Sequence, residues 1–155
     1  MLPYLEVKEK FPCRHHLPHD IPTWLSSGSL YFITVGCRPR GLNQLCHPQT
    51  ASVIFESARY RQDAGTWFAR LLLLMPDHLH ALIAFPPQQS MTTVVQQWKG
   101  RLARQTAVRW QRGFFEHRLR DPDSWEEKAH YIRQNPVRAD LIKEYENWPY
   151  FLELA

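Results

Sequence analysis

The chain has 155 residues, of which 44% are hydrophobic and 13% aromatic, and these proportions indicate one folded domain and argue against intrinsic disorder. Its apolar runs are far shorter than the roughly 20 residues of a membrane-spanning helix. Because the first residues also lack the basic start and apolar core of a signal peptide, we expect a cytoplasmic protein without a membrane partner. A net charge of +4 defines no partner by itself, and three cysteines without a CxxC pair give no sign of a disulfide framework.

The first part of the predicted domain, which spans residues 1–155, is an irregular arm over residues 1–27 that is rich in Pro, His and Arg. Residues 30–36 have the β-branched and aromatic content of a strand. Thr50 is a suitable N-cap for a helix over residues 51–63.

Two further strands are predicted on either side of a turn at Pro76 and Asp77, over residues 67–75 and 78–85. Beyond its histidines, the second of these is apolar on both faces. That pattern is typical of a central strand covered on both sides of a sheet.

The next segments are a helix and a short strand. Ser90 predicts the N-cap of a helix that extends from residue 91 to about residue 110, with an apolar stripe facing the core. Residues 113–119 have the pattern of a short strand or an edge segment.

The last segments begin with a helix over residues 125–135. Ser124 and Glu127 match a capping box at its start, and Pro136 is expected to end it. A helical turn over residues 139–145 and a C-terminal tail over residues 146–155 follow. The order β-α-β-β-α-β-α predicts an α+β domain in which helices pack on an antiparallel sheet.

Two histidines at the start of the central strand are candidate metal ligands. His78 and His80 are two residues apart, so in a strand both imidazoles point to the same face. Two imidazoles on one face can share a divalent metal ion, although histidines in strands are also ordinary polar residues.

A tyrosine on the last predicted helix is a candidate nucleophile. Tyr131 and Asn135 are four residues apart and therefore lie on the same helix face. If Tyr131 faces the metal, the side-chain oxygen of Asn135 can complete the ligand set, with Gln134 in reserve. The alternative is that Tyr131 is an ordinary half-buried aromatic residue and that Asn135 is the last residue of the helix before Pro136.

A basic stretch without acidic residues separates these two motifs. Between His78 and Phe115 there is no Asp or Glu. The cations in that interval, which we expect to contact phosphates, are Lys99, Arg101, Arg104, Arg109 and Arg112. A solvated helix face is the alternative, and the missing acids favour a nucleic-acid surface.

The ordered motifs resemble a known family. Met-Pro-Asp-His-Leu-His at residues 75–80 and Tyr-Ile-Arg-Gln-Asn-Pro-Val-Arg-Ala at residues 131–139 resemble the HUH single-tyrosine transposases, and within them the REP-associated tyrosine transposases. Residues 17–19, 28–35 and 110–120 add to this likeness, which extends over nearly the whole chain. Many relatives have Gln four residues after the tyrosine, where this chain has Asn135.

The resemblance implies an HUH endonuclease fold with a ferredoxin-like antiparallel sheet. It also implies strand transfer on single-stranded DNA with palindromic hairpins, through a 5′-phosphotyrosine on Tyr131 and with Mg²⁺ or Mn²⁺ on His78 and His80. Arg14 and His15 in the arm are expected to grip the hairpin. The state of assembly stays open between a monomer and a homodimer.

Two other functions compete with this interpretation. One is a non-catalytic protein that binds DNA hairpins on the same scaffold. The other is a metal-dependent phosphohydrolase that uses water, which would leave Tyr131 without a role. A covalent protein–DNA adduct would separate both from the transposase.

Overall fold

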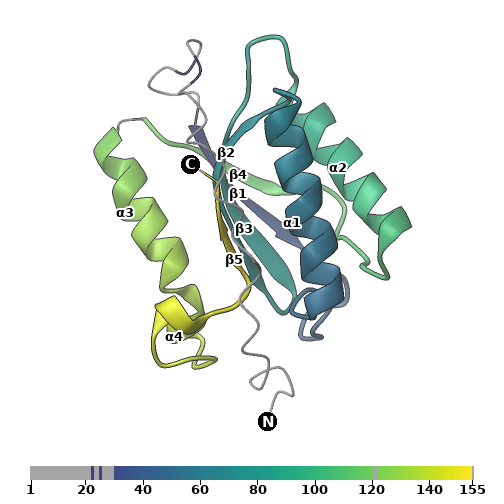
Figure 1. Cartoon of the computed structure of the whole chain (residues 1–155), viewed down its shortest axis with the longest axis vertical. Coiled ribbons are helices and arrows are strands. Elements are labelled where there is room, and N and C mark those ends of the chain that lie inside the picture. Colours follow the sequence, from purple (N-terminus) through teal and green to yellow (C-terminus); the bar gives the residue numbers. More distant parts are fainter. Residues whose placement is uncertain (1–21, 23–24, 26–29, 121, 155) are drawn as a thin grey trace.

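The computed structural model describes residues 22, 25, 30–120 and 122–154 (Figure 1). Most of the expected arm over residues 1–27, including Arg14 and His15, lies outside the described residues.

One antiparallel sheet forms the centre of the domain, with the strand order β4-β1-β3-β2-β5. Its strands are β1 (Leu30–Gly36), β2 (Phe68–Met75), β3 (His78–Ala84), β4 (Phe115–Arg118) and β5 (Phe151–Glu153). The predicted strands over residues 30–36, 67–75 and 78–85 are confirmed to within one residue at each end, and β4 is the expected edge segment.

Helices cover both faces of the sheet. Figure 1 shows α1 (Pro48–Asp63) and α2 (Met91–Gln105) side by side on one face, whereas α3 (Pro122–Arg133) and α4 (Asn135–Arg138) lie on the other. The first six elements follow the β-α-β-β-α-β order of a ferredoxin-like domain, which confirms the expected α+β class. None of the described helices is long and apolar enough to cross a membrane.

The core lies on both faces of β3, the middle strand. Every residue from Leu79 to Ala84 is buried, as predicted for a central strand. Cys37 and Cys46 are buried free thiols of the same core, and burial, with a smaller effect of the Asp77 charge, raises the pKa of Cys37 to about 12.

Two of the three predicted helix caps are wrong. Helix α1 begins at Pro48, so Thr50 lies inside its first turn, and α3 begins at Pro122, so Ser124 is not its cap. Proline is accepted in a first turn because its missing N–H would have no partner there. The prediction for α2 is confirmed, since the Ser90 hydroxyl accepts a hydrogen bond of 3.3 Å from a backbone N–H three residues later.

Helix α2 is shorter than predicted and ends at Gln105 instead of residue 110. Thr106 has an extended backbone, and its hydroxyl donates to the Leu102 carbonyl at 2.6 Å. The chain then follows the end of β1, where Trp110 forms a β-bridge with Cys37. The expected basic helix is therefore divided into a helical and an extended part.

The helix predicted to continue to residue 135 ends at Arg133, and Pro136 lies inside the short helix α4 instead of terminating the helix. The residues predicted as a helical turn, 139–145, are mostly irregular, and a 3₁₀ turn, η2 (Tyr145–Asn147), follows.

The predicted C-terminal tail is part of the fold. Trp148 and Tyr150 are buried, and β5 pairs with the outer edge of β2. Three-residue strands such as β5 are too short to show a periodicity of their own in the sequence.

Candidate active site

The two histidines of β3 lie together on the face of the sheet that α3 covers. Their ring centroids are 4.8 Å apart, with an interplanar angle of 75°. On the same face the β1 ring of Phe32 stacks on His80 at 5.2 Å, and Lys128 of α3 lies over Phe32. The pair thus faces the helix that contains Tyr131.

An aspartate orients the first histidine. The Asp77 carboxylate lies 2.8 Å from Nδ1 of His78 and also accepts a hydrogen bond of 2.8 Å from the Gly41 N–H. Burial alone would raise the pKa of Asp77, but these hydrogen bonds and the Arg40 charge hold it below its usual value. A carboxylate that accepts from Nδ1–H leaves Nε2 of His78 free, as in metal sites with a second shell of carboxylates.

The second histidine is buried and neutral. His80 is 8% exposed, and its Nδ1 lies 2.9 Å from the Thr34 hydroxyl. Burial, together with smaller electrostatic effects of His78, Arg138, Lys128 and Arg40, lowers the pKa of His80 to about 3. When the proton is on Nδ1, the ring donates to Thr34 and presents the lone pair of Nε2, which is the form that binds metal ions.

Tyr131 lies on α3, with 50% of its surface exposed, between two cations. The guanidinium carbon of Arg138 is 4.0 Å from its ring centroid, and Nζ of Lys128 is 5.0 Å away. Because the same Nζ is 4.8 Å from the Phe32 ring, Lys128 links Tyr131 with the Phe32–His80 stack. The phenol and the histidines therefore share one side of the sheet.

Asn135, the expected third ligand, starts helix α4. Its Oδ1 accepts a hydrogen bond of 2.9 Å from Arg138, whose guanidinium also donates to the Tyr131 carbonyl at 2.8 Å. A carbonyl oxygen has two lone pairs, so one remains. Within the described residues no group of three or more His, Cys, Asp or Glu side chains gathers.

The donor set fits a divalent metal ion. Two imidazoles, each with Nδ1 engaged and Nε2 available, are suitable ligands for Mn²⁺, and less so for Mg²⁺, which prefers oxygen.

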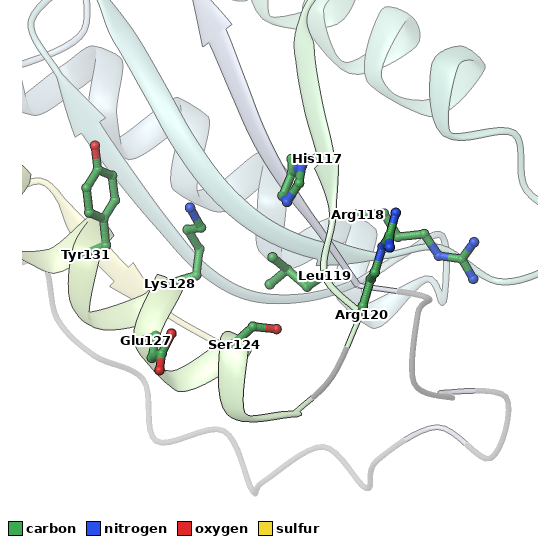
Figure 2. Close-up of a pocket in the computed structure, with 8 residues that line it drawn as sticks. All are labelled: His117, Arg118, Leu119, Arg120, Ser124, Glu127, Lys128 and Tyr131. Carbon is green, nitrogen blue, oxygen red and sulfur yellow. The ribbon is translucent and has the colours of Figure 1, made fainter.

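A pocket of about 470 Å³ lies beside this site, between β4 and α3 (Figure 2). Figure 2 shows Lys128 and Tyr131 extending from α3 on one side of it, with His117 and the arginines coming from β4 and the residues after it. The lining residues are His117, Arg118, Leu119, Arg120, Ser124, Glu127, Lys128 and Tyr131.

The predicted phosphate-contacting residues do not form one surface. Arg101 and Arg104 are exposed on α2, which covers the sheet face opposite to the histidines (Figure 1). Arg109 and Arg112 are exposed in the segment that runs along the end of β1, where Gly36 pairs with His78.

Lys99 is a correction, because its position does not allow it to reach DNA. It is 6% exposed, and its ammonium donates to the carbonyls of Gln111 at 2.7 Å and Gly113 at 2.6 Å. Burial lowers its pKa. Lys99 is therefore a structural residue that fastens the segment after α2 to the helix.

Replacing Lys99 by Met should destabilise the fold by about 2 kcal/mol, because two carbonyls lose a charged donor. Arg101→Met, an exposed change on the same helix, should alter the free energy of unfolding by less than about 0.5 kcal/mol. Urea denaturation measures both. Equal stability of the two variants would contradict the structural role of Lys99.

The sequence profile of the family described as "Transposase IS200 like" matches residues 48–146, which is more than half of the chain. The chain belongs to this family. The matched range of this IS200-like transposase contains both histidines, Tyr131 and the whole of α2 and α3.

Three relatives extend the comparison beyond the family profile. A Haemophilus influenzae protein, provisionally named a REP-associated tyrosine transposase, is 26% identical over 144 residues, covering 81% of this chain and 80% of the relative. The REP-associated tyrosine transposase of Escherichia coli K12 is 23% identical over 130 residues, covering 79% and 75%. A solved structure of a REP-associated tyrosine transposase bound to a REP hairpin has the same fold, with a TM-score of 0.69, 20% identity, and coverage of 84% of this chain and 79% of that one.

Four residues around the candidate site were not identified from the sequence: Thr34, Asp77 as a partner of His78, Lys128 and Arg138. Lys128 precedes Tyr131 by three residues and so lies on its helix face, a spacing that could have been used. Thr34 faces His80 only through the pairing of β1 with β3, and the sequence does not give that register.

Proposed function

We propose that this IS200-like transposase is a metal-dependent endonuclease and strand transferase for single-stranded DNA, acting at hairpins through a 5′-phosphotyrosine on Tyr131. The observation that supports this best is the link through Lys128 and Phe32 that joins Tyr131 to the His78–His80 pair on one side of the sheet.

In the proposed site, Nε2 of His78 and Nε2 of His80 hold Mg²⁺ or Mn²⁺. Asn135 is the proposed third ligand, and Gln134 is the reserve. When bound, the metal ion withdraws charge from the scissile phosphate. Asp77 and Thr34 fix the two imidazole rings through their Nδ1 atoms.

The proposed reaction exchanges one phosphodiester for another. The Tyr131 oxygen forms a bond to phosphorus while the bond from phosphorus to the 3′ oxygen breaks. The proton that leaves the phenol is balanced by the proton that the departing 3′ oxygen gains. A 3′-hydroxyl can then attack the phosphotyrosine and rejoin the strand, so no nucleotide cofactor is needed.

The proposed partner is single-stranded DNA with a palindromic hairpin. The solved relative was bound to a REP hairpin, and this chain shares its fold. The exposed arginines at positions 101, 104, 109 and 112 are the proposed phosphate contacts among the described residues, with Arg14 and His15 proposed from the arm. Homodimer formation remains a prediction.

Two pairs of arginines allow the DNA surface to be located. Arg109 and Arg112 lie nearer to the histidine end of the sheet than Arg101 and Arg104, which are on the opposite face. We expect Arg109→Glu with Arg112→Glu to weaken hairpin binding by at least about 10-fold and to reduce the salt slope by roughly 1 to 2. Anisotropy across a salt series measures both values, and a larger effect of the Arg101 and Arg104 pair would place the duplex on the α2 face.

A non-catalytic hairpin-binding protein is the second candidate. It is favoured by one observation, the hydrogen bond between Arg138 and Asn135 that occupies part of the third proposed ligand. To decide between the two, labelled hairpin DNA is incubated with the protein and Mg²⁺ or Mn²⁺ and then separated under denaturing conditions. The transposase predicts a covalent complex, whereas a binding protein gives free DNA only.

A further inference from the structure

The pocket between β4 and α3 opens beside the candidate nucleophile. Tyr131 and Lys128 line it from α3 (Figure 2). Lys128 also lies over the Phe32 ring that stacks on His80. A DNA strand whose phosphate reaches the histidines and Tyr131 would therefore have its next nucleotide in this pocket.

The charges around the pocket suit an anion. Three lining residues are cations, Arg118, Arg120 and Lys128, and one is an acid, Glu127. Such an excess of positive charge in a hollow raises the local concentration of phosphates.

Lys128 is the cation best placed to bind a phosphate. The residue is half-buried, and its Nζ lies 5.0 Å from the Tyr131 ring centroid and 4.8 Å from the Phe32 ring centroid. In the part of the chain that the structure describes, no carboxylate forms an ion pair with it. Two aromatic faces hold the ammonium in place, and an N–H donor that does not point at a ring can bind an anion.

The size and polarity of the pocket suit a nucleotide. Its volume of about 470 Å³ lies in the range of small-ligand sites. Leu119 supplies an apolar wall, while the Ser124 hydroxyl and the His117 ring supply hydrogen-bonding groups for the edge of an unpaired base.

We infer that this pocket binds the single-stranded nucleotide next to the cleaved bond, and that Lys128 is a positioning residue that binds its backbone phosphate. The inference rests on the proposed function and names the part of the DNA that the site recognises. It separates a nucleotide-reading pocket on the α3 side from the duplex contacts made by the arginines elsewhere.

The test removes one charge from each partner. Binding is measured in a Tyr131→Phe background, which keeps the DNA intact, with hairpins that have a single-stranded extension and one uncharged methylphosphonate at each successive linkage. Lys128→Met is compared with Lys143→Met, the same change at an exposed lysine outside the pocket. Thermal unfolding verifies the fold, and Lys128→Gln serves as a second variant.

We expect Lys128→Met to weaken binding about 10-fold and to reduce the salt slope by roughly 0.7, as for one contact to a single strand. At one linkage, the methylphosphonate should weaken DNA binding by a similar factor in the protein with Lys128 intact and hardly at all in Lys128→Met. Lys143→Met should change DNA affinity less than 2-fold. The inference would be overturned if the affinity losses from the methylphosphonate and from Lys128→Met were additive at every linkage. Equal DNA affinities of Lys128→Met and Lys143→Met would also overturn it.

The outcome is separate from that of the proposed function. If one methylphosphonate position loses its effect in Lys128→Met but the wild-type protein never forms a covalent adduct, the catalytic proposal fails and the pocket assignment stands. If the adduct forms but the effect of the methylphosphonate is independent of Lys128 at every linkage, only the pocket assignment fails.

Discussion

Tyr131→Phe should eliminate the covalent protein–DNA complex, with a loss of at least about 10³-fold in the rate of strand cleavage. The substitution removes only the hydroxyl, so the ring keeps its contacts with Lys128 and Arg138. Fold and hairpin affinity should therefore remain within about 2-fold of wild type. Gel separation after incubation with Mn²⁺ measures the complex, and anisotropy measures the affinity.

Tyr60→Phe is a matched control. Tyr60 is also exposed, at 64%, and it also has a cation near its ring, Arg101 at 6.0 Å. It lies on α1, on the sheet face opposite to the histidines, so its hydroxyl should not affect cleavage. A complex that persists in Tyr131→Phe and disappears in Tyr60→Phe would reverse the assignment.

His78→Ala and His80→Ala should each reduce cleavage by at least about 100-fold, because each removes one of the two proposed imidazole ligands. Hairpin affinity should change little, since the proposed phosphate contacts are elsewhere. Binding of Mn²⁺ without DNA, followed by calorimetry, should be lost in both variants and provides a readout that does not depend on activity.

Two further variants extend the histidine experiment, one with an intermediate expected effect and one as a control. Asp77→Asn keeps both imidazoles but weakens the acceptor of His78, so Mn²⁺ affinity should decrease by about 10 to 100-fold. His47→Ala removes an exposed histidine at the start of α1 and should leave Mn²⁺ binding unchanged. Normal cleavage in both β3 histidine variants would show that the metal site is elsewhere.

The elements that the sequence predicted well are those with a clear local pattern. The strand over residues 30–36 followed from its β-branched and aromatic content, and the placement of His78 and His80 on one face followed from alternation along a strand. The central position of β3 followed from its apolar residues on both faces. These features depend on local pattern, and local pattern is what a sequence shows.

The parts that could not be predicted depend on contacts between distant segments. Lys99 appeared to belong to a basic helix, yet its ammonium binds carbonyls of residues that return to α2 only because the helix ends at Gln105. Strand β5 exists because the chain after Trp148 meets the free edge of β2. Neither contact has a sequence period.

The candidate site shows the same division. The motif residues His78, His80 and Tyr131 could be named from the sequence, whereas the position of Lys128 between the Tyr131 and Phe32 rings follows from the packing of α3 on the sheet. The hydrogen bond of Asn135 with Arg138 likewise follows from the start of a separate helix at residue 135.

The central claim is that Tyr131 is the residue that becomes linked to DNA. The chain has six tyrosines, Tyr4, Tyr31, Tyr60, Tyr131, Tyr145 and Tyr150, so the claim can be tested against the other five. The most direct measurement is mass spectrometry of peptides from a trapped complex with labelled hairpin DNA. We predict that the nucleotide is attached to the peptide containing Tyr131 alone, and attachment to any other residue would contradict the mechanism.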